Sequence, residues 1–115
     1  EEIKAAGGEA IFFRADVSSA DDCEGMVRCA EETYGKLTCL FNNAGVMLGD
    51  DGDAESTTED IWDLTMAINV KGVFFGCKYG IPAIKRAQEM NRAGRPALLE
   101  FITKEEGEYS KFRFG

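Results

Sequence analysis

The chain has 115 residues, which is enough for one small domain. Its 13 Lys and Arg against 21 Asp and Glu give a formal net charge of −8, and a surplus of that sign repels phosphate backbones, so we predict no nucleic-acid binding. The longest apolar run, Ile68 to Cys77, is interrupted by Lys71 and is too short to cross a bilayer, so we expect no membrane span.

The cysteines carry no metal or nucleophile signature. The sequence has no histidine and no Cys-x-x-Cys pair; its four cysteines are Cys23, Cys29, Cys39 and Cys77. Zinc sites and thiol nucleophiles usually need such partners, so we predict neither a metal site nor His-based catalysis. Scattered thiols are typical of small core residues in a reducing compartment, and we expect a cytoplasmic protein. The acidic run 50–55 lacks the turn glycine and final glutamate of a calcium loop, and we interpret it as a solvated loop.

The first predicted elements are the end of a helix, a strand and a second helix. The glycines at 7–8 end the incoming helix, and residues 10–15 form an apolar run of strand length with aromatic and β-branched content. A serine at 18–19 is placed to cap a helix that begins near Ala20, where acidic residues follow in the first turn. Apolar residues then recur at helical spacing until Gly35, which predicts the helix end.

A second apolar run, residues 37–41, ends in the turn-forming residues Asn42-Asn43-Ala44-Gly45. Strand, helix and strand in this order are typical of a parallel sheet covered by helices on both faces. Ligands of such sheets bind at the carboxyl ends of the strands, where both Asp16 and residues 42–45 are expected. Two interpretations remain for each: an ordinary turn that bonds its own backbone, or a group that contacts a ligand.

A long helix is predicted after the acidic run. Ser56 and Glu59 have the spacing of a capping box, and apolar residues on two stripes of residues 58–83 indicate a helix that is covered on more than one side. Three glycines on one face, Gly72, Gly76 and Gly80, indicate that another segment packs closely against the helix backbone, since each lowers helix propensity by about 1 kcal/mol relative to Ala. Pro82 is expected to kink or end the helix.

Asn69 stands out because it lies on an apolar stripe between Met66 and Val73. An amide left without a partner there would cost roughly 1–3 kcal/mol, so it needs a hydrogen-bond partner. It could be a helix amide bonded to a neighbouring loop, or a polar group that bonds backbone or water near a functional site.

Three segments in order, residues 15–18, 40–46 and 68–74, resemble the short-chain dehydrogenase/reductase family. The resemblance covers roughly residues 1–90. It implies an α/β fold, an incomplete Rossmann-like doubly wound parallel sheet, in which the two predicted strands correspond to the family's third and fourth. In the family's strand order, 3-2-1-4-5-6-7, these two are not neighbours. It also implies two regions of the chain: a partial dinucleotide-binding domain at 1–95 and a divergent tail at 96–115.

The resemblance also implies roles for single residues. Asp16 would bond the adenine amino group of NAD or NADP, and Val17 would bond the ring through its backbone. Asn42, Ala44 and Gly45 would brace the sheet and line the adenosine ribose and the nicotinamide side. Asn69 would be the catalytic-tetrad Asn, which orders a water in the proton relay to the active-site Lys.

Other family motifs do not occur in the sequence. It contains no Gly-rich Thr-Gly-x-x-x-Gly-x-Gly turn, and no catalytic Ser with a Tyr-x-x-x-Lys pair; Tyr109 and Lys111 are two residues apart. The resemblance therefore implies part of an NAD(P)-dependent oxidoreductase that transfers a hydride between nicotinamide and a small alcohol or carbonyl substrate. These residues alone are expected to be inactive.

The long helix gives a second hypothesis of a different class. Family members commonly form homo-oligomers that bury this helix against its symmetry mate, and the two apolar stripes agree with such a partner. The chain could instead be a non-catalytic interaction module that binds a full-length relative through the helix 58–83.

Overall fold

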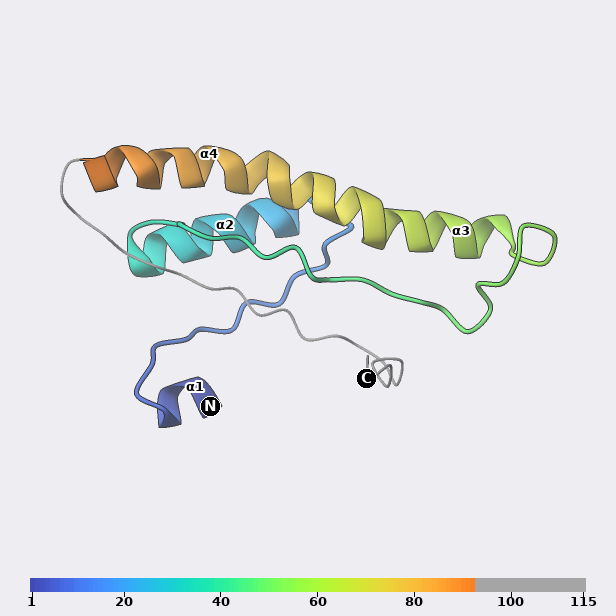
Figure 1. Ribbon diagram of the computed structural model, residues 1–115, viewed down its shortest axis with the longest axis horizontal. Coiled ribbons are helices and arrows are strands. Elements are labelled where there is room, and N and C mark those ends of the chain that lie inside the picture. Colours follow the sequence, from blue (N-terminus) through green and yellow to red (C-terminus); the bar gives the residue numbers. More distant parts are fainter. Residues whose placement is uncertain (93–115) are drawn as a thin grey trace.

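The computed structural model describes residues 1–92, and within them every regular element is helical. Figure 1 shows a long helical rod formed by residues 59–92, with another helix running beside its C-terminal part and an isolated short helix at the N-terminus. The elements are α1 (Glu2–Ala5), α2 (Ala20–Tyr34), α3 (Glu59–Met66), the π-helical turn η1 (Ala67–Lys71) and α4 (Gly72–Arg92). The predicted tail 96–115 lies outside the described residues. No helix in residues 1–92 is both long and apolar enough to cross a membrane.

Helix α2 has the bounds that its local sequence predicts. The Ser19 hydroxyl accepts a hydrogen bond from the backbone N–H of Asp22 at 3.3 Å, which satisfies one of the free amides of the first turn. At the other end Gly35 adopts φ +82°, a left-handed conformation that only glycine enters freely, and its N–H donates to the Glu31 carbonyl at 2.8 Å. The predicted cap and stop are confirmed.

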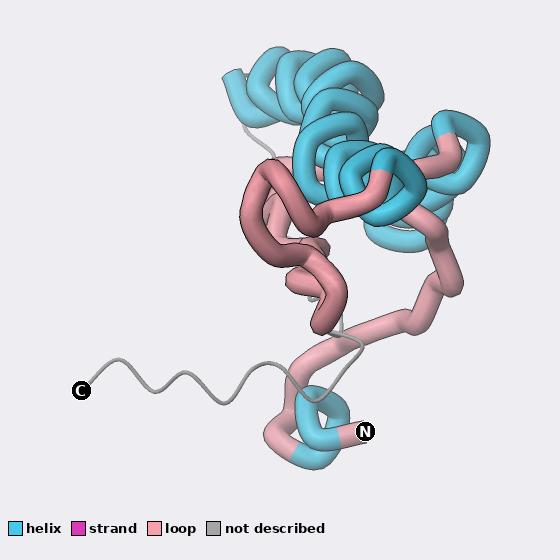
Figure 2. The backbone as a smooth tube through the Cα atoms, turned by 90° about the vertical axis from the view of Figure 1, so that its right-hand side faces the viewer, coloured by secondary structure: helices cyan, strands magenta, loops and turns pink. Residues whose placement is uncertain are grey.

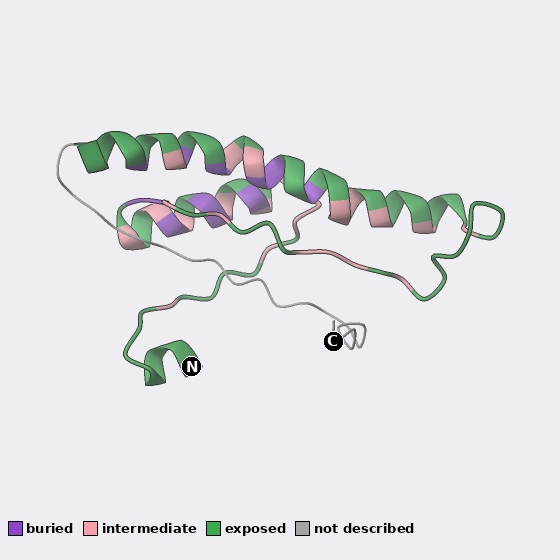
Figure 3. Ribbon diagram, viewed as in Figure 1, coloured by how far each residue is buried: buried purple, intermediate pink, exposed green. Residues whose placement is uncertain are grey.

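The small core lies where α2 packs against α4. Val27 of α2, Leu37 of the following loop and Ala83 of α4 are buried together, with Tyr79 and Ile84 packed against them. In Figure 3 the buried residues lie mainly on the sides of α2 and α4 that face each other, whereas α3 is exposed or half-buried along its whole length. The described part of the chain is therefore held together chiefly by one helix pair.

Polar contacts fix the edge of this helix pair. The Arg86 guanidinium of α4 makes a bidentate contact with the Glu31 carboxylate of α2, with Nε–Oε1 at 3.0 Å and Nη2–Oε2 at 2.7 Å. Farther along, Lys36 Nζ donates to Asn91 Oδ1 at 2.6 Å. Both contacts join α4 to residues that lie 55 positions earlier, in α2 and just after it. They therefore favour one alignment of α2 along α4.

The two predicted strands do not form a sheet in the described residues. Residues 10–15 and 37–41 run as loops in Figure 2, and no backbone hydrogen bond joins them. A strand is stable only beside a hydrogen-bonded neighbour, and the family order places two other strands between these. Several of their apolar side chains are correspondingly open, with Phe12 89% and Phe41 60% exposed, whereas Leu37 is buried against the helix pair.

The start and the course of the long helix differ from the sequence prediction in two places. Ser56 does not cap it: the Ser56 hydroxyl donates instead to Asp53 Oδ1 at 2.7 Å, and α3 begins at Glu59 after Thr58, which makes no side-chain cap bond. Pro82 does not end it, because α4 continues to Arg92, so of the two expected effects of Pro82 only a kink stays a prediction. Pro82 is exposed, so its ring meets solvent rather than a packed neighbour.

Candidate functional site

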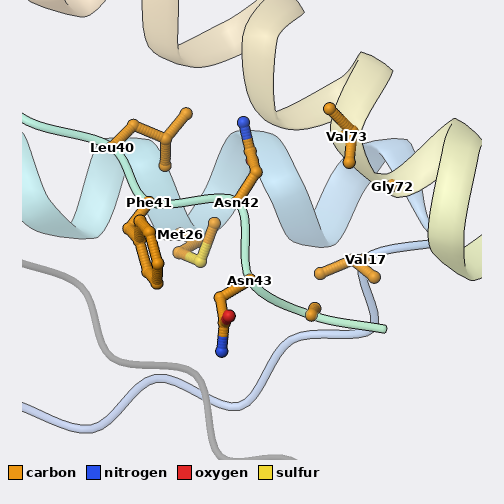
Figure 4. A pocket seen from close by; sticks show the side chains of 9 residues that line it. Val17, Met26, Leu40, Phe41, Asn42, Asn43, Gly72 and Val73 are labelled. Atoms are coloured by element: carbon orange, nitrogen blue, oxygen red, sulfur yellow. The ribbon is translucent and has the colours of Figure 1, made fainter. Parts of the chain in front are cut away.

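A small hollow lies between the start of α4, the loop before α2 and the turn after residues 37–41. Three of the residues predicted to contact a cofactor, Val17, Asn42 and Ala44, line it together with Gly72 at the start of α4 (Figure 4). Its other lining residues are Met26, Leu40, Phe41, Asn43 and Val73. Segments that are far apart in the sequence thus meet at the place where the two apolar runs end.

Most of this lining is apolar. Met26 comes from α2, and Phe41 and Val73 come from segments that flank the predicted site residues. Sequence analysis did not assign these side chains to the site, because each also fits an ordinary core or strand pattern. A mostly apolar wall with few polar groups is typical of small-molecule pockets.

Asp16 lies beside the hollow and does not line it. Its Oδ1 accepts hydrogen bonds from the Ser18 backbone N–H at 2.9 Å and from the Ser18 hydroxyl at 2.7 Å. These bonds stabilise the carboxylate and lower the pKa of Asp16. The backbone N–H of Asp16 donates to Asp22 Oδ2 at 2.8 Å. The turn interpretation of Asp16 is therefore confirmed, while its exposed Oδ2 makes no hydrogen bond within the described residues and can accept one.

Asn69 clamps the loop that follows residues 42–45. Its Oδ1 accepts from the Val46 backbone N–H and its Nδ2 donates to the Val46 carbonyl, both at 2.7 Å. Gly45 lies next to this contact, because a Cβ on Gly45 would be 3.4 Å from Asn69 Oδ1. The expectation of a helix amide bonded to a neighbouring loop is confirmed.

The π-helical turn η1 surrounds Asn69, and no pattern in the sequence predicted it. A π turn replaces the usual hydrogen bonds between residues four apart with bonds between residues five apart. Such turns are rare and are found frequently at functional sites. The turn lies on the rod where α3 meets α4, beside the loop that Asn69 holds.

The predicted glycine face of α4 is confirmed. Gly72, Gly76 and Gly80 are all buried, and each is approached by a residue from the loops. A Cβ on Gly72 would lie 2.8 Å from Val17 Cγ2, and one on Gly80 would lie 2.6 Å from Leu40 Cδ2. A Cβ on Gly76 would overlap the side-chain amide of Asn42. The absence of side chains on this face lets the hollow form directly against the helix.

The known proteins that this chain resembles in sequence point to one family. The sequence profile described as "short chain dehydrogenase" matches residues 1–93. An uncharacterized oxidoreductase of Thermotoga maritima is 45% identical over 86 residues, which are 75% of this chain and 33% of that protein. The 2,5-dichloro-2,5-cyclohexadiene-1,4-diol dehydrogenase LinX of Sphingobium indicum is 36% identical over 86 residues, 75% of this chain and 34% of that one.

The solved structures agree with the sequence comparison. The NADH-dependent reductase A1-R′ complexed with NAD superposes with a TM-score of 0.70 at 29% identity, over 84% of this chain and 39% of that one. The chain spans about one third of the length of the curated relatives it matches. Because the family profile covers most of the sequence, the chain belongs to the short-chain dehydrogenase family.

Proposed function

We propose that this chain is the part of an NAD(P)-dependent oxidoreductase that holds the adenosine half of the cofactor and supplies the relay asparagine. The observation that carries the proposal is the meeting of Val17, Asn42 and Ala44 in one hollow beside the exposed Asp16 carboxylate. When bound, the cofactor would accept or supply a hydride at its nicotinamide, in exchange with an alcohol or carbonyl substrate.

The chemistry of the hollow fits an adenine ring. An aromatic ring gains from apolar contacts such as those of Val17 and Met26, while an exocyclic amino group needs an acceptor at the ring edge. Asp16 supplies that acceptor, because Ser18 holds Oδ1 and leaves Oδ2 exposed. Asn42 and Ala44 line the wall that would face the ribose, and Gly45, which does not line the hollow, would continue this wall toward the nicotinamide.

Asn69 takes the relay role in this proposal. Both polar atoms of its side chain already hold the Val46 backbone, so the side chain fixes the loop and the turn η1 in one arrangement. Water in the proton relay would then bond the Asn69 backbone carbonyl, since a π turn disturbs the regular carbonyl ladder of a helix.

The proposal also includes a parallel sheet in the complete enzyme. Residues 10–15 and 37–41 would be the third and fourth strands of a doubly wound parallel sheet, each paired with strands that the present sequence does not contain. Without the Gly-rich turn and the Tyr-x-x-x-Lys pair, the 115 residues alone should not oxidise NADH.

A hybrid enzyme tests this function. Residues 1–92 would replace the matching segment of LinX, and NAD⁺ reduction would be followed with the diol for which that enzyme is named. We expect turnover by the hybrid. We expect kcat to fall at least about tenfold with Asn69→Ala, because a positioned proton relay contributes about 10²-fold or more. The matched control is Gln88→Ala, an exposed amide near the far end of α4. A folded hybrid without turnover, or equal rates for the two variants, would refute the proposal.

The exposed apolar side chains of the rod support a second candidate function, which is binding to another protein. Trp62 and Phe74 are 58% and 59% exposed, and Ile81 is 48% exposed. The helix 58–83 could therefore dock on a full-length relative, as family members do in their oligomers. Phe74, rather than the buried Phe75, is the residue to change. Co-purification with a tagged relative should be lost with Phe74→Asp and kept with Gln88→Asp; no association of the unchanged chain would dismiss this function.

A further inference from the structure

Each glycine of the glycine face of α4 contacts a residue that lines the hollow. The side chain of Val17 packs against Gly72, that of Asn42 against Gly76 and that of Leu40 against Gly80. All three of these side chains belong to residues that line the hollow. Each glycine lowers helix propensity by about 1 kcal/mol relative to Ala, so α4 would be more stable as an isolated helix without them. The close approaches explain why this helix has glycine at these positions.

Gly76 is the most restrictive of the three. A Cβ there would overlap Asn42 Oδ1 and would lie 3.1 Å from Asn42 Cγ, so the whole amide group would have to move. The same helix also holds the amide, because Asn42 Nδ2 donates to Sγ of the next residue, Cys77, at 3.7 Å. In Figure 4 the Asn42 side chain points toward α4, whereas the Asn43 side chain points away from it.

This orientation gives the two asparagines of the turn different roles. The side chain of Asn42 is seated on the helix, so it anchors the chain at this point, and the backbone of residues 42–44 forms the wall of the hollow opposite Val17. The approach of Asn42 to Gly76 is one of the contacts that hold this wall against α4. An added methyl group would displace the Asn42 amide from the helix and remove this anchor.

We propose that Gly76 is a positioning residue of the cofactor site: by lacking a side chain it admits the Asn42 amide against α4 and so sets the place of residues 42–44. The inference rests on the proposed function of the hollow as the adenosine site. Gly76 itself would not touch the cofactor; its effect passes through Asn42.

The test uses the full 115-residue chain labelled with ¹⁵N, with AMP as the probe. Titration followed by NMR should shift the amide signals of Val17 and Ala44 in the unchanged chain. Gly76→Ala should weaken AMP binding about tenfold, which corresponds to about 1.4 kcal/mol. The control is Gly25→Ala in the middle of α2, where a Cβ would meet only the ring tip of Phe13 at 3.2 Å; its affinity should not change.

A double-mutant cycle separates positioning from a general loss of stability. In an Asn42→Gly background, Gly76→Ala should have no further effect on AMP affinity, because the group it displaces is gone. Additive effects would overturn the positioning role, as would an unchanged affinity of Gly76→Ala. A wild-type chain whose signals do not respond to AMP would overturn both the proposed adenosine site and this inference, whereas a normal wild-type response that Gly76→Ala leaves intact overturns this inference alone.

Discussion

The clamp between Asn69 and the Val46 backbone should contribute measurably to stability. Asn69→Ala removes two hydrogen bonds of 2.7 Å, each worth about 0.5–1.5 kcal/mol net, and leaves a half-buried N–H and C=O without this partner. The better helix propensity of alanine opposes this loss by about 0.5 kcal/mol. We therefore expect the free energy of unfolding to fall by about 1–2 kcal/mol.

Urea denaturation followed by circular dichroism at low protein concentration measures this change. The control is Asn43→Ala, which removes an exposed amide that points away from α4 in Figure 4 and should be nearly neutral. Asn69→Asp keeps the acceptor for the Val46 N–H but places a carboxylate oxygen against the Val46 carbonyl, so it should destabilise more than Asn69→Ala. The reasoning is refuted if Asn69→Ala lies within about 0.5 kcal/mol of the unchanged chain, the range of ordinary surface substitutions.

Three further predictions concern the helix pair and the turn before it. Leu37→Ala should lower the free energy of unfolding by about 2–5 kcal/mol, because Leu37 is fully buried between α2 and α4, whereas Leu64→Ala, at a side chain that is 46% exposed, should change it little in the same denaturation assay. Ser19→Ala should reduce stability by about 1 kcal/mol through the lost cap, which amide hydrogen exchange in the first turn of α2 will show. Ser18→Ala should raise the pKa of Asp16, which carboxyl ¹³C NMR measures directly. Because the folded pKa of Asp16 is lowered, its contribution to stability is present above the unfolded pKa and lost as pH falls through the folded pKa, and Ser18→Ala should flatten that dependence.

Local signals in the sequence predicted the local parts of the structure. The bounds of α2 follow from Ser19 and Gly35, whose effects reach only a few residues along the chain. The predicted start of the long helix was wrong, and the reason is also local. The Ser56 hydroxyl bonds Asp53 instead of capping the helix, and periodicity alone could not show which of these two contacts forms.

Contacts between distant segments could be predicted only in part. The position of Asn69 on an apolar stripe showed that its amide needs a partner, but not that the partner is Val46, 23 residues earlier. The glycine spacing likewise showed that something approaches α4, without identifying Asn42. Met26 gave no signal at all, because a methionine on the buried face of α2 looks the same whether or not it lines a ligand site.

The missing sheet and the formed hollow have a common physical explanation. A strand needs hydrogen-bonded neighbours, and residues 10–15 find none in the described part of the chain, which leaves Phe12 89% exposed. The ends of the two apolar runs have a different support: Val17 and Asn42 seat on glycines of α4, and Val46 is held by Asn69. The long helix can therefore hold the carboxyl-end turns in place although residues 10–15 and 37–41 form no backbone hydrogen bond with each other. This makes the position of the candidate site depend on η1 and α4 more directly than on the sheet.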